Sequence, residues 1–224
     1  MSIQIQGSGG VIQEVDGSTF RAARVVSRPV DHGALGAYSV GLISGVIPAA
    51  LAANSEIFQF RWSDATRLCV VRKIKISAAV STTFFAAGVP IQIDLVKATG
   101  WSAAGSGGTR VTPAALLKRR TSMGSTLIAA SDIGISSTAA LTAGTKTLET
   151  VALSTLVAAG PITASLNGQI IVPDTILWQA EVSDGEHPLV LAQNEGFVIR
   201  SIAVPATGTW TAAITVDWAE VTAY

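Results

Sequence analysis

The sequence has little charge and a single cysteine. Charged residues make up 13% of the 224 residues, about half of the ~25% usual for a soluble domain. The 15 basic residues balance the 15 acidic ones, so net charge does not favour nucleic acid as a partner. Cys69 cannot form an internal disulfide, which fits synthesis and assembly in a reducing cytoplasm. A surface so poor in charge predicts extensive subunit contacts, although exposed faces rich in Thr and Ser are the alternative.

Export and membrane signals are also missing. The N-terminus (MSIQIQGSGG) has neither a basic region nor an apolar core, so we expect no signal peptide. The uncharged stretches 33–55 and 150–173 are long enough to cross a bilayer. Both are interrupted by Pro, Gly, Ser, Thr or Asn and lack flanking clusters of Lys and Arg. We therefore predict neither a transmembrane helix nor a membrane partner.

The sequence offers few residues for chemistry. The two histidines, His32 and His187, lie beside carboxylates but have no ligand partner at helical or hairpin spacing, which favours turn residues with local hydrogen bonds. The stretch GSGG (105–108) lacks the Gly-Lys-Ser/Thr of a phosphate-binding loop, and no nucleophile elbow or zinc signature is present. We predict no catalytic, cofactor or metal site. A glycan-cleaving enzyme remains a remote alternative, because sequence cannot show the separation of two carboxylates.

The C-terminal residues give the clearest structural pattern. Apolar residues alternate with polar or small ones from Trp210 to Trp218, which predicts a strand with one buried face. Residues 188–193 and 197–204 form two further apolar runs, joined at Asn194-Glu195-Gly196, where Gly196 could take the left-handed conformation of a bulged hairpin loop. This end of the chain therefore reads as a β-meander.

Further strands are predicted throughout the chain. Alternation and turn residues place them at 38–47, 56–62, 68–80, 90–98, 127–135, 146–156, 169–172 and 176–182. With the C-terminal runs this makes about ten strands separated by short turns, typical of an all-β antiparallel sandwich or jelly roll. Buried positions are expected for Trp62, Trp210 and Trp218, whereas Trp178 is ambiguous.

Two segments depart from this pattern. Residues 1–30 resemble an extended arm with short alternating pieces, which either adds a strand to a neighbouring subunit or packs on its own domain, residues 31–224. Residues 99–126 read as an inserted loop, with a short helix possible after Thr112-Pro113. The candidate partner-binding residues come from these two segments: Ile3, Ile5, Val11, Ile12, Arg21, Arg24, Arg28, Trp101, Arg119 and Arg120. Trp101 is expected to be exposed; for Arg21, Arg24 and Arg28 a solvated strand edge is favoured over a docking patch.

Several segments of the chain have a distinctive wording: GLISG (41–45), LAANSEIFQFRW (51–62), RTSMG (120–124), STAALTAGTK (137–146), DGEHPLVLAQNEGFVI (184–199) and PATGTW (205–210). These segments resemble a family of tailed-bacteriophage proteins described as hypothetical or virion-associated. The resemblance runs along the whole chain, and the family has no catalytic motif to carry over. It implies a non-enzymatic structural component of the virion.

The leading expectation is a capsid decoration (cement) protein. Such a protein would bind the major capsid protein on the outer surface of the head, stabilise the head, and associate with copies of itself around a symmetry axis, as a trimer for example. A tail or baseplate adaptor, or a host-surface-binding module, is the second hypothesis. Sequence gives neither the oligomer number nor the location on the particle.

Overall fold

The computed structural model describes residues 4–6, 12–14, 36–48, 51–82, 90–112, 117–159, 170–180, 187–203 and 207–224. The chain divides into two compact units, Met1–Asp31 and His32–Tyr224. In the first unit, β1 (Gln4–Gln6) pairs antiparallel with β2 (Ile12–Glu14). A two-stranded hairpin is marginally stable by itself, so strands this short gain little stability from their own pairing.

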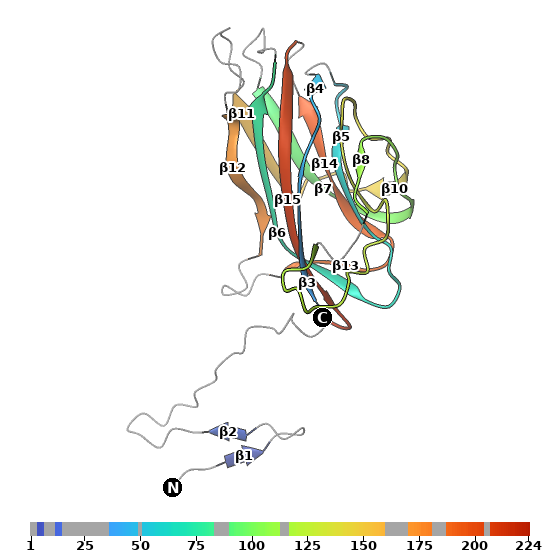
Figure 1. Cartoon of the computed structure of the whole chain (residues 1–224), viewed down its shortest axis with the longest axis vertical. Helices are drawn as coiled ribbons and strands as arrows, with labels where there is room; N and C mark the ends of the chain where they lie inside the picture. Colours follow the sequence, from blue (N-terminus) through green and yellow to red (C-terminus); the bar gives the residue numbers. More distant parts are fainter. Residues whose placement is uncertain are drawn as a thin grey trace, which may run out of the picture. The chain divides into compact units, whose positions relative to one another are not determined.

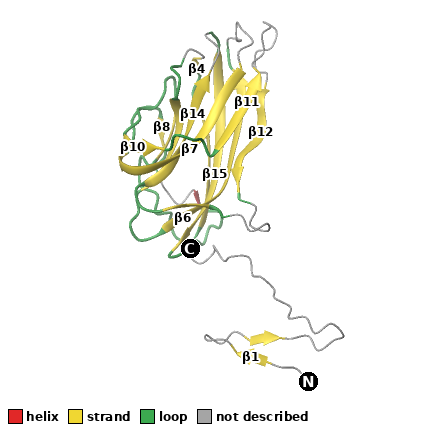
Figure 2. Ribbon diagram, turned by 180° about the vertical axis from the view of Figure 1, so that it is seen from behind, coloured by secondary structure: helices red, strands yellow, loops and turns green. Residues whose placement is uncertain are grey.

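The second unit consists of two antiparallel sheets (Figures 1 and 2). The six-stranded sheet contains β3 (Ala37–Ile43), β4 (Ile47–Pro48), β6 (Leu68–Val80), β12 (Ile170–Gln179), β13 (Leu189–Leu191) and β15 (Thr209–Val221). The seven-stranded sheet contains β5 (Ser55–Trp62), β7 (Pro90–Ala103), β8 (Thr109–Arg110), β9 (Ile133–Ile135), β10 (Thr145–Leu148), β11 (Ser154–Ala159) and β14 (Glu195–Ala203). The predicted all-β antiparallel sandwich is confirmed.

The longest strands pair in a nested order. Eight strands in the described part of the second unit have six or more residues: β3, β5, β6, β7, β11, β12, β14 and β15. Taken in chain order, the first pairs with the last, the second with the seventh, the third with the sixth and the fourth with the fifth. Further pairings of β15 with β6 and of β14 with β7 join these couples into two sheets.

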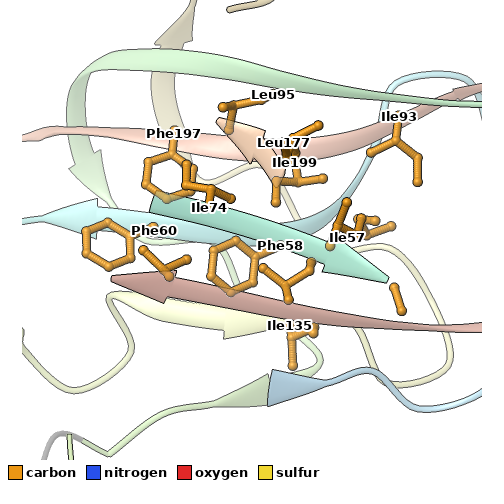
Figure 3. Packing of buried hydrophobic residues seen from close by; sticks show 14 of the residues in the cluster. Ile57, Phe58, Phe60, Ile74, Ile93, Leu95, Ile135, Leu177, Phe197 and Ile199 are labelled. Atoms are coloured by element: carbon orange, nitrogen blue, oxygen red, sulfur yellow. The ribbon is translucent and has the colours of Figure 1, made fainter. Parts of the chain in front are cut away.

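The core lies between the two sheets, where aromatic and branched aliphatic side chains meet (Figure 3). Phe60 stacks on Phe197 with ring centroids 5.1 Å apart and meets Trp218 edge-on at 5.4 Å. Trp62 and Trp210 are also fully buried, which confirms the prediction for these indoles. β15 alternates between buried and half-buried residues along most of its length, as its sequence pattern predicts.

The C-terminal meander prediction is wrong. β13 pairs with β6 in the six-stranded sheet, β14 pairs with β5 and β7 in the seven-stranded sheet, and β15 returns to the six-stranded sheet. Consecutive strands therefore alternate between the layers. Period-two alternation identifies a strand and its buried face, but a strand of either sheet shows the same pattern because both sheets face one core.

The connection between β13 and β14 also differs from its prediction. The residue with positive φ is Asn194, at 62°, rather than Gly196. Asparagine tolerates this conformation better than most residues. Gly196 is needed for a different reason, because a Cβ atom there would lie 2.1 Å from the carbonyl oxygen of Phe60 and 3.0 Å from the Trp101 ring.

Several strand boundaries differ from those expected. The run 146–156 forms two strands, β10 and β11, whereas 169–172 and 176–182 merge into β12. Pro173 lies in β12 at a register shift, which accommodates a residue that has no amide hydrogen. In the predicted strand 38–47, β3 ends at Ile43. In the predicted strand 127–135, only Ile133–Ile135 forms a strand.

The insertion expected at 99–126 is partly strand. β7 continues through Ala103, and β8 follows at Thr109–Arg110. The core of the short helix expected after Thr112 falls on residues 113–116, which lie outside the described residues. No helix in the described ranges combines the length and apolar character required to traverse a bilayer.

Candidate interaction surfaces

The outer face of the seven-stranded sheet is partly covered by the chain itself. A second small core forms there from Val96, Ala98, Trp101 and Val198, and Leu148 packs against it. The Trp101 indole donates a hydrogen bond to the carbonyl oxygen of Ala103 at 3.0 Å. The segment between β7 and β11, described at 104–112 and 117–153, is called the excursion; it contains β8, β9 and β10.

A buried charged cluster attaches the excursion to β5. The Lys146 ammonium lies 2.9 Å from Oε2 of Glu56, and the two side chains are only 2% and 6% exposed. Gln59 donates to the same oxygen at 2.6 Å and to the carbonyl oxygen of Thr142 at 2.8 Å. Arg110 donates to Oε1 of Gln59 at 3.1 Å. Burial lowers the pKa of Lys146, while its hydrogen bond to Glu56 acts in the opposite direction.

Asp132, the residue before β9, forms a neighbouring polar group. Arg61 lies 3.6 Å from its Oδ1 atom, and the Ser63 hydroxyl donates to Oδ2. Burial raises the pKa of Asp132, while Ser63 and Arg61 oppose this rise. The carboxylates of Glu56 and Asp132 thus each face a cation, and no group of three potential metal ligands occurs within the described ranges. The cluster therefore holds the excursion in place.

Residues 117–128, called the strap, cross the end of the six-stranded sheet. The Arg119 amide donates to the carbonyl oxygen of Ala37 at 3.0 Å, and the Tyr38 hydroxyl donates to that of Gly124 at 3.1 Å. At the far end, Thr126 donates to Oε1 of the buried Glu220 at 2.5 Å. Burial raises the pKa of Glu220, and the hydrogen bond from Thr126 opposes the rise.

The outer face of the six-stranded sheet is only half-buried in the second unit. The side chains on this face, called the open face, are mainly small or hydroxyl-bearing: Ser39, Gly41, Ile43, Ser77, Ala79, Thr211, Ala213 and Thr215. Its charges are largely paired, Lys75 with Asp174 and Arg119 with Asp217. Such a flat surface with few unpaired charges suits contact with another protein.

Five exposed aliphatic residues belong to β11, to β12 or to the residues just before β11, and these two strands adjoin where the two sheets meet along one side (Figures 1 and 2). Val157 is 61% exposed and Ile170 is 64% exposed. The full set, called the aliphatic edge, is Val151, Leu153, Val157, Ile170 and Ile176. Clustered exposed aliphatic side chains mark interaction sites more often than scattered ones do.

A groove of about 280 Å³ lies beside β13 and the start of β14. Lys97 and Glu149 line it and form an ion pair of 2.9 Å. His187 also lines it, with Nδ1 2.7 Å from the carbonyl oxygen of Pro188 and its ring 5.1 Å from that of Tyr224. The local hydrogen bond expected for His187 is thus confirmed, whereas His32 lies outside the described residues.

The predicted partner-binding residues belong to both units of the chain. Ile5 lies in β1 and Ile12 in β2. Arg119 lies in the strap, 3.0 Å from Asp217, and the Arg120 guanidinium donates to the Ser122 hydroxyl at 2.8 Å. The remaining arm residues lie outside the described part of the chain: Ile3, Val11, Arg21, Arg24 and Arg28.

The expectation that Trp101 is an exposed loop residue is wrong. It lies in β7 and has no exposed surface. The Lys146 ammonium lies 4.5 Å from the ring centroid, a cation–π arrangement. Of the glycines that suggested a loop, Gly100 lies within β7, with φ 59°, and Gly105, Gly107 and Gly108 follow the end of that strand. Sequence pattern also gave no sign of the aliphatic edge, because its members look like ordinary core residues.

A scan against protein-family models found no matching model, and searches of curated proteins and of solved structures found no match.

Proposed function

We propose that this chain is a non-enzymatic structural protein of a tailed-bacteriophage virion, a decoration protein that binds the outer surface of the capsid and stabilises it. Its partners are the major capsid protein and copies of itself. The observation that carries the proposal is that one molecule has two candidate contact surfaces, the open face and the aliphatic edge. Both offer contact area with few unpaired charges, as a subunit of a large assembly requires.

The nested strand order supports a jelly-roll assignment. In a jelly roll, a long antiparallel hairpin folds over so that eight strands form two facing sheets, and the fold recurs in viral capsid domains. The strands β3, β5, β6, β7, β11, β12, β14 and β15 pair in this manner. Because one fold serves many functions, the order only adds to the argument from the surfaces.

Capsid binding tests the proposal directly. Purified protein is added to heads assembled without it, and bound copies are counted by quantitative mass spectrometry after sedimentation. Saturable binding with many copies per head, together with a higher melting temperature of the heads, is the expected result. Absence of binding, or recovery of the protein in tail fractions of the intact phage, would overturn the assignment.

A matched pair of variants tests the contact surface. Val157→Asp places a charge on the aliphatic edge, whereas Thr138→Asp places one on an exposed residue of the excursion. A buried unpaired charge at an interface costs several kcal/mol, so Val157→Asp should abolish saturable binding while Thr138→Asp leaves it unchanged. Equal binding by both variants would exclude the aliphatic edge as the capsid contact.

A further inference from the structure

The groove beside β13 runs along a strand edge of the six-stranded sheet. Among the described strands, β13 pairs only with β6, and all three of its residues line the groove. Further lining residues come from β7, from the segment after β10 and from the start of β14. The volume of about 280 Å³ is just below the ~300–1,000 Å³ of sites that enclose a small ligand. The groove therefore suits part of a longer molecule laid along β13.

The direction of the backbone groups in β13 follows from the hydrogen bonds of the same sheet. The Glu220 amide donates to the carbonyl oxygen of Gly36, so the backbone groups of Glu220 point to the side of β3. Those of Cys69, its partner in β6, point the opposite way, toward β13. Leu191, the partner of Cys69 in β13, directs its groups back to β6. Because successive residues alternate, Val190 directs its amide and carbonyl groups away from β6.

Val190 is an open position of this edge. In the described part of the chain, no hydrogen bond or β-bridge reaches its outward groups. The outward positions on either side are already taken. Pro188 has no amide hydrogen, and its carbonyl oxygen lies 2.7 Å from Nδ1 of His187. The Ala192 amide donates to Oε2 of Glu195 at 2.8 Å. A strand laid beside β13 can therefore exchange two backbone hydrogen bonds with Val190.

The side chains of the groove favour a basic ligand. Glu149 and Glu195 both line it, together with Lys97 and His187. Lys97 and Glu149 form their ion pair with side chains 37% and 43% exposed, so both groups remain within reach of a ligand. With His187 neutral, the lining carries two carboxylates and one ammonium group. A lysine or arginine side chain of the ligand complements this excess of negative charge.

We propose that the groove binds an extended polypeptide segment with a basic side chain, which pairs with Val190 as an added strand. In strand addition, main-chain hydrogen bonds to a sheet edge give affinity, and contacts of the side chains give specificity. Val190 supplies one backbone donor and one acceptor, while Glu149 and Glu195 supply the charge complementarity. The inference does not depend on the capsid proposal.

Selection from a randomised library of short peptides, with the full chain as bait, tests the site. The selected peptides should contain lysine or arginine. Val190→Pro removes the outward amide hydrogen and breaks no bond to β6, whereas Val190→Thr keeps this hydrogen and the branched side chain. Fluorescence anisotropy should give equal dissociation constants for the parent and Val190→Thr, and one at least tenfold higher for Val190→Pro. Failure to select any peptide, or equal affinity of all three proteins, would overturn the proposal.

Hydrogen exchange provides a second test should Val190→Pro fail to fold. The Val190 amide of the parent should exchange more slowly when a selected peptide is bound, because the added strand then accepts its hydrogen bond. Contact through side chains alone would leave this amide exposed to solvent. A saturating peptide that does not slow the exchange of Val190 would refute strand addition.

A pair of charge reversals tests the preference for a basic ligand. Glu149→Lys should weaken binding of a selected basic peptide by about tenfold or more, since like charges then meet in the groove. The matched control is Asp174→Lys, which reverses an exposed carboxylate in β12 and should leave binding unchanged. Equal weakening by both variants would show that binding follows net charge alone and would exclude the groove as the site.

Discussion

Gly196 lies at a close approach within the second unit, with the Phe60 carbonyl oxygen and the Trp101 ring as its nearest neighbours. We expect Gly196→Ala to destabilise the protein by about 1 to 3 kcal/mol, the usual cost of overpacking. Urea unfolding measures the loss. Gly41→Ala is the matched control, because a Cβ atom there makes only an ordinary van der Waals contact. Equal stability of both variants would show that the Phe60 backbone can move aside.

Glu220 makes stability depend on pH. Its pKa in the folded state is raised above the ordinary value of 4.5, mainly by burial, so the folded state holds the proton more tightly than the unfolded state does. The stabilisation is therefore fully present below pH 4.5 and is lost as the pH rises through the higher folded-state pKa.

Glu220→Gln should remove this contribution. The amide oxygen can still accept from the Thr126 hydroxyl, but the side chain no longer titrates. Melting temperature measured from pH 4 upward, at ~1-unit steps, should fall less for the variant than for the parent. Glu149→Gln, which removes a half-exposed carboxylate, controls for the change in net charge. Parallel pH profiles for parent and Glu220→Gln would contradict the prediction.

At the level of elements, sequence pattern located strands better than it located their partners. β6 was predicted with both of its ends correct, because its sequence begins with an apolar run and alternates regularly from Lys73 to Val80. The sheet to which β14 belongs is decided by contacts with β5 and β7, which lie far away in the sequence. Local alternation identifies a strand but contains no information on such pairings. The same pattern therefore gave both the correct strand assignments and the wrong meander.

The candidate surfaces were predicted less well for the same reason. Trp101 follows a glycine and precedes a Gly-rich stretch, a pattern typical of exposed loops. Its burial depends on Lys146 and Leu148, which follow some forty-five residues later in the sequence. The charged cluster likewise unites Glu56 with Lys146. Spacings this long have no periodicity from which a contact could be inferred.

The buried pair of Lys146 and Glu56 should dominate the attachment of the excursion. Lys146→Met keeps an apolar stem beside Trp101 but leaves the Glu56 carboxylate buried without its cation. Removing one partner of a buried pair costs about 3 to 5 kcal/mol. The control is Lys97→Met, which breaks a pair whose side chains are 37% and 43% exposed and should cost below about 1 kcal/mol.

Chemical denaturation of both variants measures these costs. Hydrogen exchange should also show faster exchange of excursion amides in Lys146→Met, since local opening precedes global unfolding where attachment is weakened. The Thr142 amide, which donates to the carbonyl oxygen of Ser106 at 3.0 Å, is a suitable reporter. Similar unfolding free energies for Lys146→Met and Lys97→Met would show that the hydrogen bonds of Gln59 suffice to hold the excursion.

At the scale of the whole molecule, the division of the chain into Met1–Asp31 and His32–Tyr224 allows the role of the first unit to be tested by truncation. The second unit contains the large hydrophobic core and both of its sheets. Removal of residues 1–28 should therefore leave its melting temperature nearly unchanged. Under the proposed function, the arm adds contacts to the capsid, and its loss should weaken capsid binding by about tenfold or more, equivalent to ~1.4 kcal/mol.

The two measurements on the truncated protein separate the possible roles of the arm. A folded protein with weakened binding supports the arm as an attachment element, because its short strands gain stability by joining a larger sheet. An insoluble or molten protein would instead make residues 1–28 part of the folding unit. A folded protein with undiminished binding would show that the second unit alone makes the capsid contact. In that case the open face or the aliphatic edge has to supply the capsid contact, and the binding of Val157→Asp distinguishes between these two surfaces.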